Sequence, residues 1–424
     1  MPFLAQTKPR RHAGAVLWSC GKSGTAFFAC RHCLFTDMLD VMRQKPSNPL
    51  LEFGRTMKHI KKITALLAAL AAIAGTVISG CAPSIGKLPS GDRLARISMS
   101  PHYRDGRFHS LEPTRIFTGQ EGGDFSMLGF LLGKGEGRYP GKPLPLAATD
   151  LKALPPDRDA VVWLGHSSIY LQIGGKRILL DPVLGKNAGP FGTNKAFIGD
   201  YPWAAADLPD IDCLIISHDH WDHLEYPTMK AIKDRVGAVV CPLGVGSHLE
   251  YWGFDPAIIH EGDWDDTITL GSGLSVRLLP ARHSSGRWIR RDKTFWASFL
   301  IESPSIRIFY SGDGGYGKHF AEIGEKHGGM DLALMECGQY NLAWHAIHML
   351  PEEMLKAADD IKAKHVIPVH SGRFSIAPHP WQEPYERMSA EAPRHSCTML
   401  TPRIGEPVFL DALDDAAFTP WWEH

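Results

Sequence analysis

The sequence predicts an α/β fold with many short strands in its interior and helices on the outside. Short apolar runs recur from residue 160 onward, and helical stretches lie between some of them. The chain has 424 residues, 44% of them hydrophobic, which is ordinary for a globular protein. Its net charge of -1 argues against a general polyanion binder, so no nucleic-acid partner is expected. We assign residues 159–424 to one α/β domain.

The domain begins with a hairpin. Residues 160–181 read as two strands joined at Gly174-Gly175, a pair typical of tight hairpin turns. The expected strands that follow are 214–217, 236–241, 276–280, 297–301, 306–311, 332–336 and 366–369. The expected helices are 228–235, 318–327 and 352–364. The cysteines in or near these strands are expected to be buried free thiols: Cys213, Cys241, Cys337 and Cys397.

Residues 57–80 predict a secretory signal peptide that begins at Met57. A basic segment with three lysines precedes the uncharged stretch 63–77, and small residues then lead to a cysteine. Residues 78–81 resemble the lipobox of bacterial lipoproteins, which are cleaved before the cysteine and acylated on it. A membrane-spanning helix and a buried core helix are the alternatives for this stretch.

The segments on either side of this signal have separate expected roles. Residues 1–56 are expected to be an upstream extension without function. Residues 81–99, rich in Pro, Gly and Ser at their start, predict a tether, and residues 100–158 predict an irregular extension packed on the domain. Acylation at Cys81, with Ala82 rather than Asp after it, implies a lipid anchor in the outer membrane, on the periplasmic side of the bacterial cell envelope.

Ligand-type side chains recur where predicted strands end. The run SHDHWDH at residues 217–223 places three histidines and two aspartates directly after an apolar strand. Burying even a neutral polar group without a partner costs about 2–7 kcal/mol, so a core strand has no use for them. Three later strands each lead to one such residue, at His283, Asp313 and His370. A polar turn could explain any one of these positions, but their recurrence indicates a metal site.

The order of these residues resembles the metallo-β-lactamase superfamily. Its HxHxDH motif stands at residues 218–223, and a distant His, Asp and His follow in that order. The resemblance implies a four-layered αβ/βα sandwich with two metal sites that share one carboxylate. The first metal would be held by His218, His220 and His283, the second by Asp222, His223 and His370, and the bridge would be Asp313.

Longer stretches are closer to one branch of that superfamily. VVWLGHSSIYLQIGGKRILLDPVLG, SGDGGYGKHFAEIG and PVHSGRFSIAPHPWQEP resemble the N-acylphosphatidylethanolamine phospholipase D family and its bacterial relatives. This resemblance implies a phosphodiesterase that acts on a phospholipid-like substrate. The ascorbate-6-phosphate lactonases are more distant, which leaves a lactonase or other ester hydrolase as the alternative. Ser371-Gly372 departs from the Trp-Gly that is frequent in the family.

The ligand types indicate the cofactor and the chemistry. Neutral imidazoles and carboxylates suit two Zn²⁺ ions, and Fe or Mn are also compatible. Such ions lower the pKa of water and so provide a nucleophile for a phosphorus or carbonyl centre. Among the seven ligands only Asp222 and Asp313 are anionic, so the site should favour an anionic substrate. Together with these two carboxylates we count His348 as catalytic, because it matches a position near the family's active site; a supporting or surface role is its alternative.

A basic segment supplies the candidate substrate contacts. Residues 281–293 read ARHSSGRWIRRDK, and Arg287 and Arg290 are expected to grip a phosphate through their guanidinium forks. A solvated basic loop is the alternative. His166 and Asp181 are interpreted as residues that support the metal ligands. A non-catalytic envelope lipoprotein is the competing class, but the presence of all seven ligands favours an enzyme.

Overall fold

The computed structural model describes residues 57, 62–65, 83–118, 135–271 and 273–423. The chain divides into two compact units, residues 1–75 and 76–424, and the sheets described below belong to the second. Most of the expected signal peptide, Cys81 and residues 1–56 lie outside the described residues. Among the residues that are described, no helix has the length and apolar character needed to cross a membrane.

The first sheet has seven strands among the described residues, in the order β16-β3-β4-β5-β6-β7-β8. Neighbours from β16 to β5 pair antiparallel, and neighbours from β5 to β8 pair parallel. The strands are β3 (Ala160–Trp163), β4 (Ile169–Ile173), β5 (Lys176–Leu180), β6 (Ile211–Ile215), β7 (Val236–Pro242), β8 (Ile259–Gly262) and β16 (Pro407–Phe409).

The second sheet also has seven described strands, in the order β15-β14-β13-β12-β11-β10-β9. Its strands from β9 to β12 pair antiparallel, and those from β12 to β15 pair parallel. The strands are β9 (Thr267–Gly271), β10 (Leu274–Leu279), β11 (Ser298–Glu302), β12 (Arg307–Tyr310), β13 (Met330–Glu336), β14 (Ala363–Val369) and β15 (Thr398–Met399). A separate hairpin pairs β1 (Tyr103–Arg104) with β2 (Arg107–Phe108).

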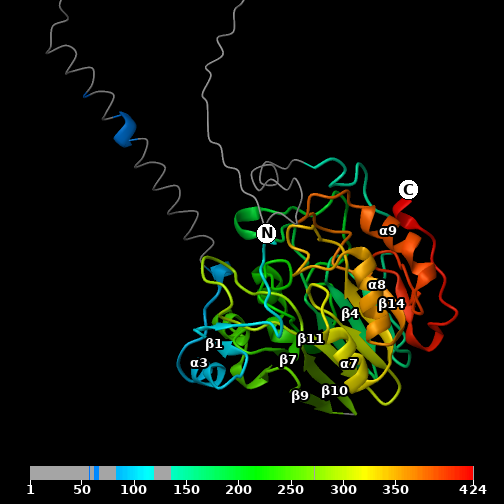
Figure 1. Cartoon of the computed structure of the whole chain (residues 1–424), viewed down its shortest axis with the longest axis horizontal. Helices are drawn as coiled ribbons and strands as arrows, with labels where there is room; N and C mark the ends of the chain where they lie inside the picture. The colour runs from blue at the N-terminus through cyan, green and yellow to red at the C-terminus, as the bar shows by residue number, and fades with distance from the viewer. Residues whose placement is uncertain (1–56, 58–61, 66–82, 119–134, 272, 424) are drawn as a thin grey trace, which may run out of the picture. The chain divides into compact units, whose positions relative to one another are not determined.

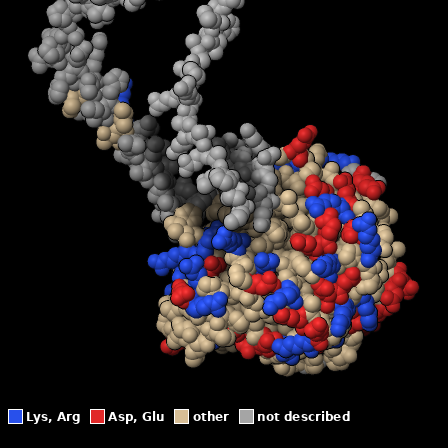
Figure 2. Space-filling model, in the orientation of Figure 1, with Lys and Arg blue, Asp and Glu red and all other residues tan. Residues whose placement is uncertain are grey.

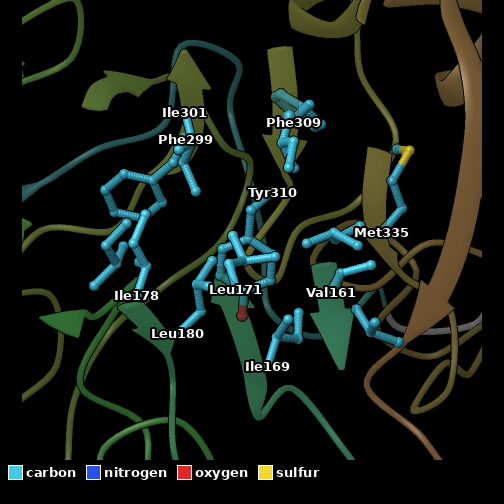
Figure 3. Close-up of a cluster of buried hydrophobic side chains, with 14 of the residues drawn as sticks. Val161, Ile169, Leu171, Ile178, Leu180, Phe299, Ile301, Phe309, Tyr310 and Met335 are labelled. Carbon is cyan, nitrogen blue, oxygen red and sulfur yellow. The ribbon is translucent and has the colours of Figure 1, made fainter. Parts of the chain in front are cut away.

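The hydrophobic core lies between the two sheets. Leu171 and Ile178 of the first sheet lie near Phe299 and Tyr310 of the second, and all four are fully buried (Figure 3). Burial of each such side chain contributes about 1.5–3 kcal/mol. On β12 the side chains alternate, so Phe309 points to the opposite face of the sheet, where its ring packs 6.4 Å from that of Phe320.

Helices cover the outer faces of both sheets. The helix α8 (Pro351–Asp360) contacts β13 and β14, and α7 (His319–His327) and α9 (Glu383–Glu391) contact α8 (Figure 1). On the first sheet, α5 (Tyr226–Ile232) connects β6 to β7, and α6 (Gly246–Tyr251) connects β7 to β8. The expected α/β fold, a four-layered αβ/βα sandwich, is confirmed.

Two local expectations need correction. Residues 160–181 form three strands rather than two, because the chain turns at Gly165 and His166, both with positive φ, before the expected turn at Gly174-Gly175. The helix expected over 352–364 ends at Asp360, and Lys362, at φ 58°, redirects the chain into β14. Four cysteines are buried and free as predicted: Cys213, Cys241, Cys337 and Cys397.

The tether expected over residues 81–99 is wrong for its described part. Residues 91–98 form the helix α3, whose Ile97 is fully buried. Arg93 and Arg96 lie 2.8 and 2.7 Å from the Glu261 carboxylate. The Pro and Gly residues at the start of this segment led to the tether prediction, although a helix that packs on the domain follows them. Of the irregular extension expected over 100–158, residues 100–118 and 135–158 are described, and in this part Phe108 stacks on Phe295 of the domain at 4.4 Å.

Strand direction brings the ligand-type residues to one edge. The strands β3, β5 and β6 of the first sheet run the same way, and so do β10, β12, β13 and β14 of the second. Each of these strands ends in, or soon leads to, an imidazole or a carboxylate. Those of the first sheet lead to His166, Asp181 and residues 217–223, and those of the second to His283, Asp313, Glu336 and His370.

Candidate metal centre

The first cluster consists of three imidazoles, those of His218, His220 and His283. Their ligand nitrogens all lie within 4.8 Å of one another. His220 Nδ1 is 2.9 Å from His218 Nε2 and 3.1 Å from His283 Nε2. Nitrogens bound at about 2.0–2.1 Å to one tetrahedral zinc ion lie about 3.3 Å apart, so the three atoms converge as ligands of one ion would.

The second cluster contains Asp222, His223 and His370, with His166 beside them. Asp222 Oδ2 lies 3.5 Å from His223 Nε2 and 4.0 Å from His370 Nε2. His166 Nε2 contacts the same oxygen at 2.9 Å. The contact agrees with a supporting role for His166, because it orients the Asp222 carboxylate. It also places His166 within reach of a metal ion that Asp222 would hold.

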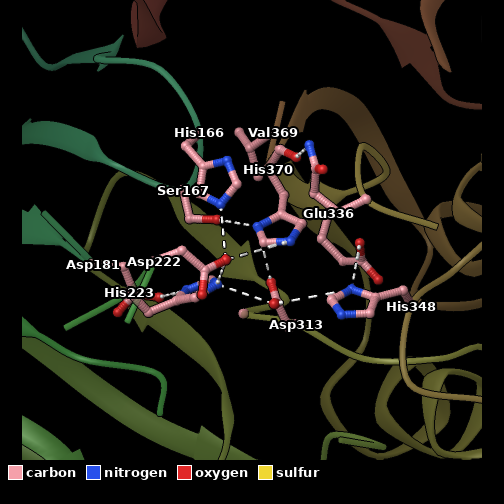
Figure 4. A network of polar contacts seen from close by, with 12 residues as sticks. His166, Ser167, Asp181, Asp222, His223, Asp313, Glu336, His348, Val369 and His370 are labelled. Carbon is pink, nitrogen blue, oxygen red and sulfur yellow. Dashed lines mark hydrogen bonds and ion pairs between the residues drawn. The ribbon is translucent and has the colours of Figure 1, made fainter. Parts of the chain in front are cut away.

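Asp313 contacts both clusters, and Figure 4 shows it beside His223 and His370 of the second. Its Oδ2 is 3.0 Å from His223 Nε2 and 3.9 Å from both His218 Nε2 and His283 Nε2. Its Oδ1 is buried and has no hydrogen-bond partner, and the same holds for His370 Nε2. Buried lone pairs without donors are costly unless a cation satisfies them. These orphaned atoms therefore fit a pair of metal ions with Asp313 as the shared ligand.

Neighbouring groups fix the orientation of the imidazoles. His283 Nδ1 lies 2.9 Å from the Ile347 carbonyl oxygen, which only accepts, so Nδ1 carries the proton and Nε2 offers its lone pair. His223 Nδ1 likewise donates to the Asp181 carboxylate at 2.7 Å. Asp181 is itself held by the Ser217 backbone N–H at 2.7 Å and by the Tyr310 hydroxyl at 2.6 Å. Carboxylate–histidine pairs of this kind accompany most metal-binding histidines.

Three of these residues have strained backbones. His166, Asp181 and His370 have φ of 53°, 39° and 64°, a region that L-residues other than glycine rarely adopt. Each such residue costs about 1–3 kcal/mol and persists only where surrounding contacts hold it. One contact is a bridge between the sheets, in which His166 N–H donates to the Ser371 carbonyl at 2.7 Å. The strain is located at the candidate metal centre.

Burial and mutual proximity tune the charges of the cluster. Burial lowers the pKa of His218, His283 and His370 well below the usual value, so these imidazoles are neutral ligands. Burial raises the pKa of Asp313, but the charge of the neighbouring His223 imidazole and its hydrogen bond outweigh burial and hold that pKa well below its usual range. The buried carboxylates therefore require positive charge nearby.

His348 lies at the side of this cluster, next to a residue that the sequence interpretation missed. His348 Nδ1 is 3.5 Å from Glu336 Oε2 and 3.9 Å from Asp313 Oδ2. Glu336 is fully buried, and burial raises its pKa to about 7 although His348 opposes this shift. The signal was available, because Glu336 ends a predicted strand in the same way as the recognised ligands do.

A cavity of about 280 Å³ opens onto the cluster. Its floor includes Asp222, Asp313, His348 and His370. Its walls are largely apolar and aromatic, with contributions from Ile116, Phe117, Trp221, Trp344, Ile347 and Ile376. One arginine, Arg291, also lines it. The shape suits a substrate with apolar chains and an anionic centre.

The expectation for Arg287 is wrong. Its side chain is 4% exposed and does not line the cavity. The guanidinium donates instead to the backbone carbonyls of Ser84, Asp219 and Leu224 at 2.6–3.0 Å. Arg290 is exposed, but it does not line the cavity either. Their neighbour Arg291 is the arginine that faces the site, which the sequence could not decide because backbone direction in a loop has no periodic signal.

Known proteins resemble this chain over most of its length. The Beta-lactamase superfamily domain matches residues 176–371. An uncharacterised protein of Mycobacterium tuberculosis is 39% identical over 328 residues, which cover 76% of this chain and 87% of that protein. Outer membrane protein RomA of Klebsiella pneumoniae is 55% identical over 106 residues, 25% of this chain and 80% of RomA.

One further relative has a named activity, and one solved structure allows a comparison of the fold. The N-acyl-phosphatidylethanolamine-hydrolyzing phospholipase D of Saccharomyces cerevisiae is 33% identical over 241 residues. That match covers 53% of this chain and half of the yeast enzyme. A metallo hydrolase from Ignicoccus hospitalis superposes with a TM-score of 0.43 at 20% identity, over 59% of this chain and 97% of its own.

The two-sheet sandwich and the histidine–aspartate cluster at its edge define a class of metal-dependent hydrolases. The chain belongs to the metallo-β-lactamase superfamily.

Proposed function

We propose that this protein is a binuclear zinc phosphodiesterase that cleaves phospholipid-like substrates in the manner of N-acylphosphatidylethanolamine phospholipase D. The observation that carries the proposal is Asp313, which lies between two convergent ligand clusters and has an unpartnered oxygen at the floor of an apolar cavity. The yeast phospholipase D relative, which this chain matches over half of that enzyme, supports the substrate class.

The residues divide into two ligand sets and a bridge. His218, His220 and His283 would hold one ion, Asp222, His223 and His370 the other, and Asp313 both. Two zinc ions there would polarise a phosphoryl oxygen and lower the pKa of water to near neutrality. The protein ligands contribute only two negative charges, so the loaded site stays electropositive. This charge favours an anionic phosphodiester over a neutral ester.

His348 is positioned to serve the leaving group. Its ring lines the cavity, and its Nδ1 is directed towards Glu336 and Asp313. A proton held on this ring can be given to the leaving alkoxide oxygen of a diester bound over the floor. Arg291, on the cavity wall, is suited to pair with a phosphate oxygen.

The test combines metal analysis with a substrate panel. Elemental analysis of the purified protein should give two ions per chain. The panel contains N-acyl phospholipids, simple phosphodiesters and lactones of matched chain length, and we expect hydrolysis of the first two. Turnover of lactones alone would favour the lactonase alternative. Full metal occupancy with no turnover of any substrate would favour a non-catalytic envelope protein.

We further propose that the protein is anchored in the outer membrane by a lipid on Cys81. The signal-like segment of residues 57–80 and the outer-membrane name of the RomA relative support this location. The protein should fractionate with membranes, and Cys81→Ser should leave it unprocessed or release it. Mass spectrometry of the mature protein provides the decision: peptides from residues 1–56, or an unmodified Cys81, would exclude the anchor.

A further inference from the structure

The loop of residues 286–293 exposes a large apolar tip at the cavity. Ile289 is 81% exposed and Trp288 is 46% exposed, while Arg291 of the same loop lines the cavity. Phe117, another residue of the cavity lining, is 49% exposed. Trp288 and Ile289 are adjacent in the chain, and adjacent apolar groups that are exposed to water beside a cavity usually indicate an interaction surface.

Four arginines, apart from the buried Arg287, lie in this loop and in the hairpin bonded to it. Arg290 and Arg291 belong to the loop, and Arg104 and Arg107 stand opposite each other in the neighbouring β1–β2 hairpin. The hairpin is attached to the loop by the Phe108 N–H, which donates to the Asp292 carbonyl at 2.9 Å, and by the Lys293 ammonium, which donates to the Gly106 carbonyl. Figure 2 shows Lys and Arg gathered near β1, whereas acidic and basic side chains mix elsewhere on this face. We call Arg104, Arg107, Phe117, Trp288, Ile289, Arg290 and Arg291 the rim surface.

The base of the loop is held rigidly while its tip is left exposed. The Gly286 N–H donates to Asp219 Oδ1 at 2.6 Å, and the Trp221 indole N–H donates to the Arg287 carbonyl at 2.9 Å. The Arg287 guanidinium lies 4.2 Å from the ring of Trp221 and 5.2 Å from that of Trp252. A tip that is presented in a fixed conformation loses little entropy when it docks.

We propose that the rim surface docks on an anionic phospholipid bilayer, with Trp288 and Ile289 in the interface and the arginines on lipid headgroups. Trp and basic residues are favoured at such interfaces, each basic residue through attraction to anionic lipid. Docking would hold the cavity mouth against the membrane, and its purpose rests on the proposed phospholipid hydrolysis. An anionic bilayer matches both features of this surface, because its interior accepts Trp288 and Ile289 and its phosphates attract the four arginines, which outnumber Asp105 and Asp292 of the same hairpin and loop.

The start of the domain supports the same orientation. The Ser84 carbonyl accepts from Arg287 Nε and Nη2 at 3.0 and 2.7 Å, so residue 84 lies against the base of the loop. Cys81 precedes Ser84 by three residues, and three residues of chain span about 11 Å at most. A lipid on Cys81 would therefore hold the face that carries the rim surface near the bilayer.

Tryptophan quenching by brominated lipids tests the docking on the full-length protein. Among the described tryptophans, Trp288 alone is exposed, so it should account for most of the quenching that vesicles of brominated phosphatidylglycerol and phosphatidylcholine produce. Trp288→Phe keeps the tip apolar and should remove most of that quenching, leaving at most the part due to Trp221 and Trp344 of the cavity wall. Undiminished quenching in Trp288→Phe, or no quenching on any vesicle, would overturn the proposal; the second outcome would point to a protein partner instead.

Charge variants test the role of the arginines. Arg104→Gln with Arg290→Gln should lower the ratio of docked to undocked protein about 25-fold, at roughly fivefold for each basic residue. A matched control, Lys326→Gln with Lys364→Gln, removes the same charge from exposed sites on α7 and β14 and should change the ratio less than twofold. Equal effects of the two pairs, or equal quenching on purely zwitterionic vesicles, would contradict docking through charge.

A kinetic comparison separates docking from catalysis. Ile289→Ser should lower turnover of vesicle-bound phospholipid and leave turnover of a soluble aryl phosphodiester unchanged, because Ile289 does not line the cavity. Equal loss on both substrates would mean that the loop shapes the active site and does not dock. If the protein hydrolyses neither substrate, the proposed function fails, and the quenching results still decide the docking.

Discussion

Asp181→Asn should weaken metal binding at the second cluster without removing any proposed ligand. Asp181 Oδ2 receives the His223 Nδ1–H and the hydroxyls of Tyr310 and Ser217, while Oδ1 receives the Ser217 backbone N–H. An asparagine offers only one accepting oxygen in this fully buried position, and its other terminal atom is an NH2 group, which only donates. Either the Ser217 backbone N–H or the donors now at Oδ2 must therefore face the amide NH2 group, which is itself a donor.

Each orientation of the amide has a calculable cost. With its nitrogen towards Ser217 N–H, the variant leaves a buried donor unsatisfied, at about 1–3 kcal/mol of stability. With its nitrogen towards His223, the imidazole must accept at Nδ1 and carry its proton on Nε2, the atom that would bind metal. Loss of a group that orients a ligand usually weakens metal affinity by about 10- to 100-fold, or about 1.4–2.7 kcal/mol.

Competition with a chelator, followed by elemental analysis, measures this effect. We expect one of two ions to be lost at 10- to 100-fold lower chelator concentration. Tyr310→Phe is the matched control, since it deletes one donor to Asp181 but keeps the His223 contact, and its metal affinity should be unchanged. Wild-type metal affinity in Asp181→Asn would refute the argument that this carboxylate fixes the His223 tautomer.

Four further predictions concern Asp313, Arg287, Arg291 and His319. Asp313→Ala should reduce hydrolysis by about 10³-fold or more and lower the metal content while circular dichroism stays native, and full activity would rule out the bridge. Arg287→Met should lower the free energy of unfolding by about 2–4 kcal/mol because it strips buried carbonyls of donors. In contrast, Arg291→Gln should leave stability unchanged and raise KM for phosphodiesters more than for a neutral ester. If instead Arg291→Gln lowered stability and Arg287→Met raised KM, the expectation from the sequence that Arg287 grips the phosphate would hold. Burial lowers the pKa of His319 to about 3, so as pH falls below about 6.5 the unfolded chain takes up a proton at this residue before the folded chain does. The free energy of unfolding should therefore drop by about 1.4 kcal/mol per pH unit down to pH 3, relative to that of His319→Gln. Parallel pH profiles of urea unfolding for the two proteins would exclude this.

The sequence by itself predicted an α/β fold and a metal site where strands end, and its resemblance to the metallo-β-lactamase superfamily implied the four-layered sandwich and the seven candidate ligands. The first two follow from local signals, since a buried strand must be apolar and a histidine or aspartate directly after it stands out. Residues 217–223, His283, Asp313 and His370 all carried that contrast. The strand directions then bring these residues together, because strands that run the same way within a sheet have their ends at one edge.

Only the tertiary structure decided what each supporting side chain does. Arg287 and Arg291 are chemically identical and four residues apart, yet one is buried against carbonyls and the other lines the cavity. Glu336 and Asp181 acquire their roles from partners more than ten residues away in the chain, at His348 and His223. Hydrogen bonds between such distant residues leave no periodic trace in the sequence, because they depend on where separate strands end in space. The same reason explains why residues 83–99 read as a tether, although their contacts lie on β8 and on the loop that carries Arg287.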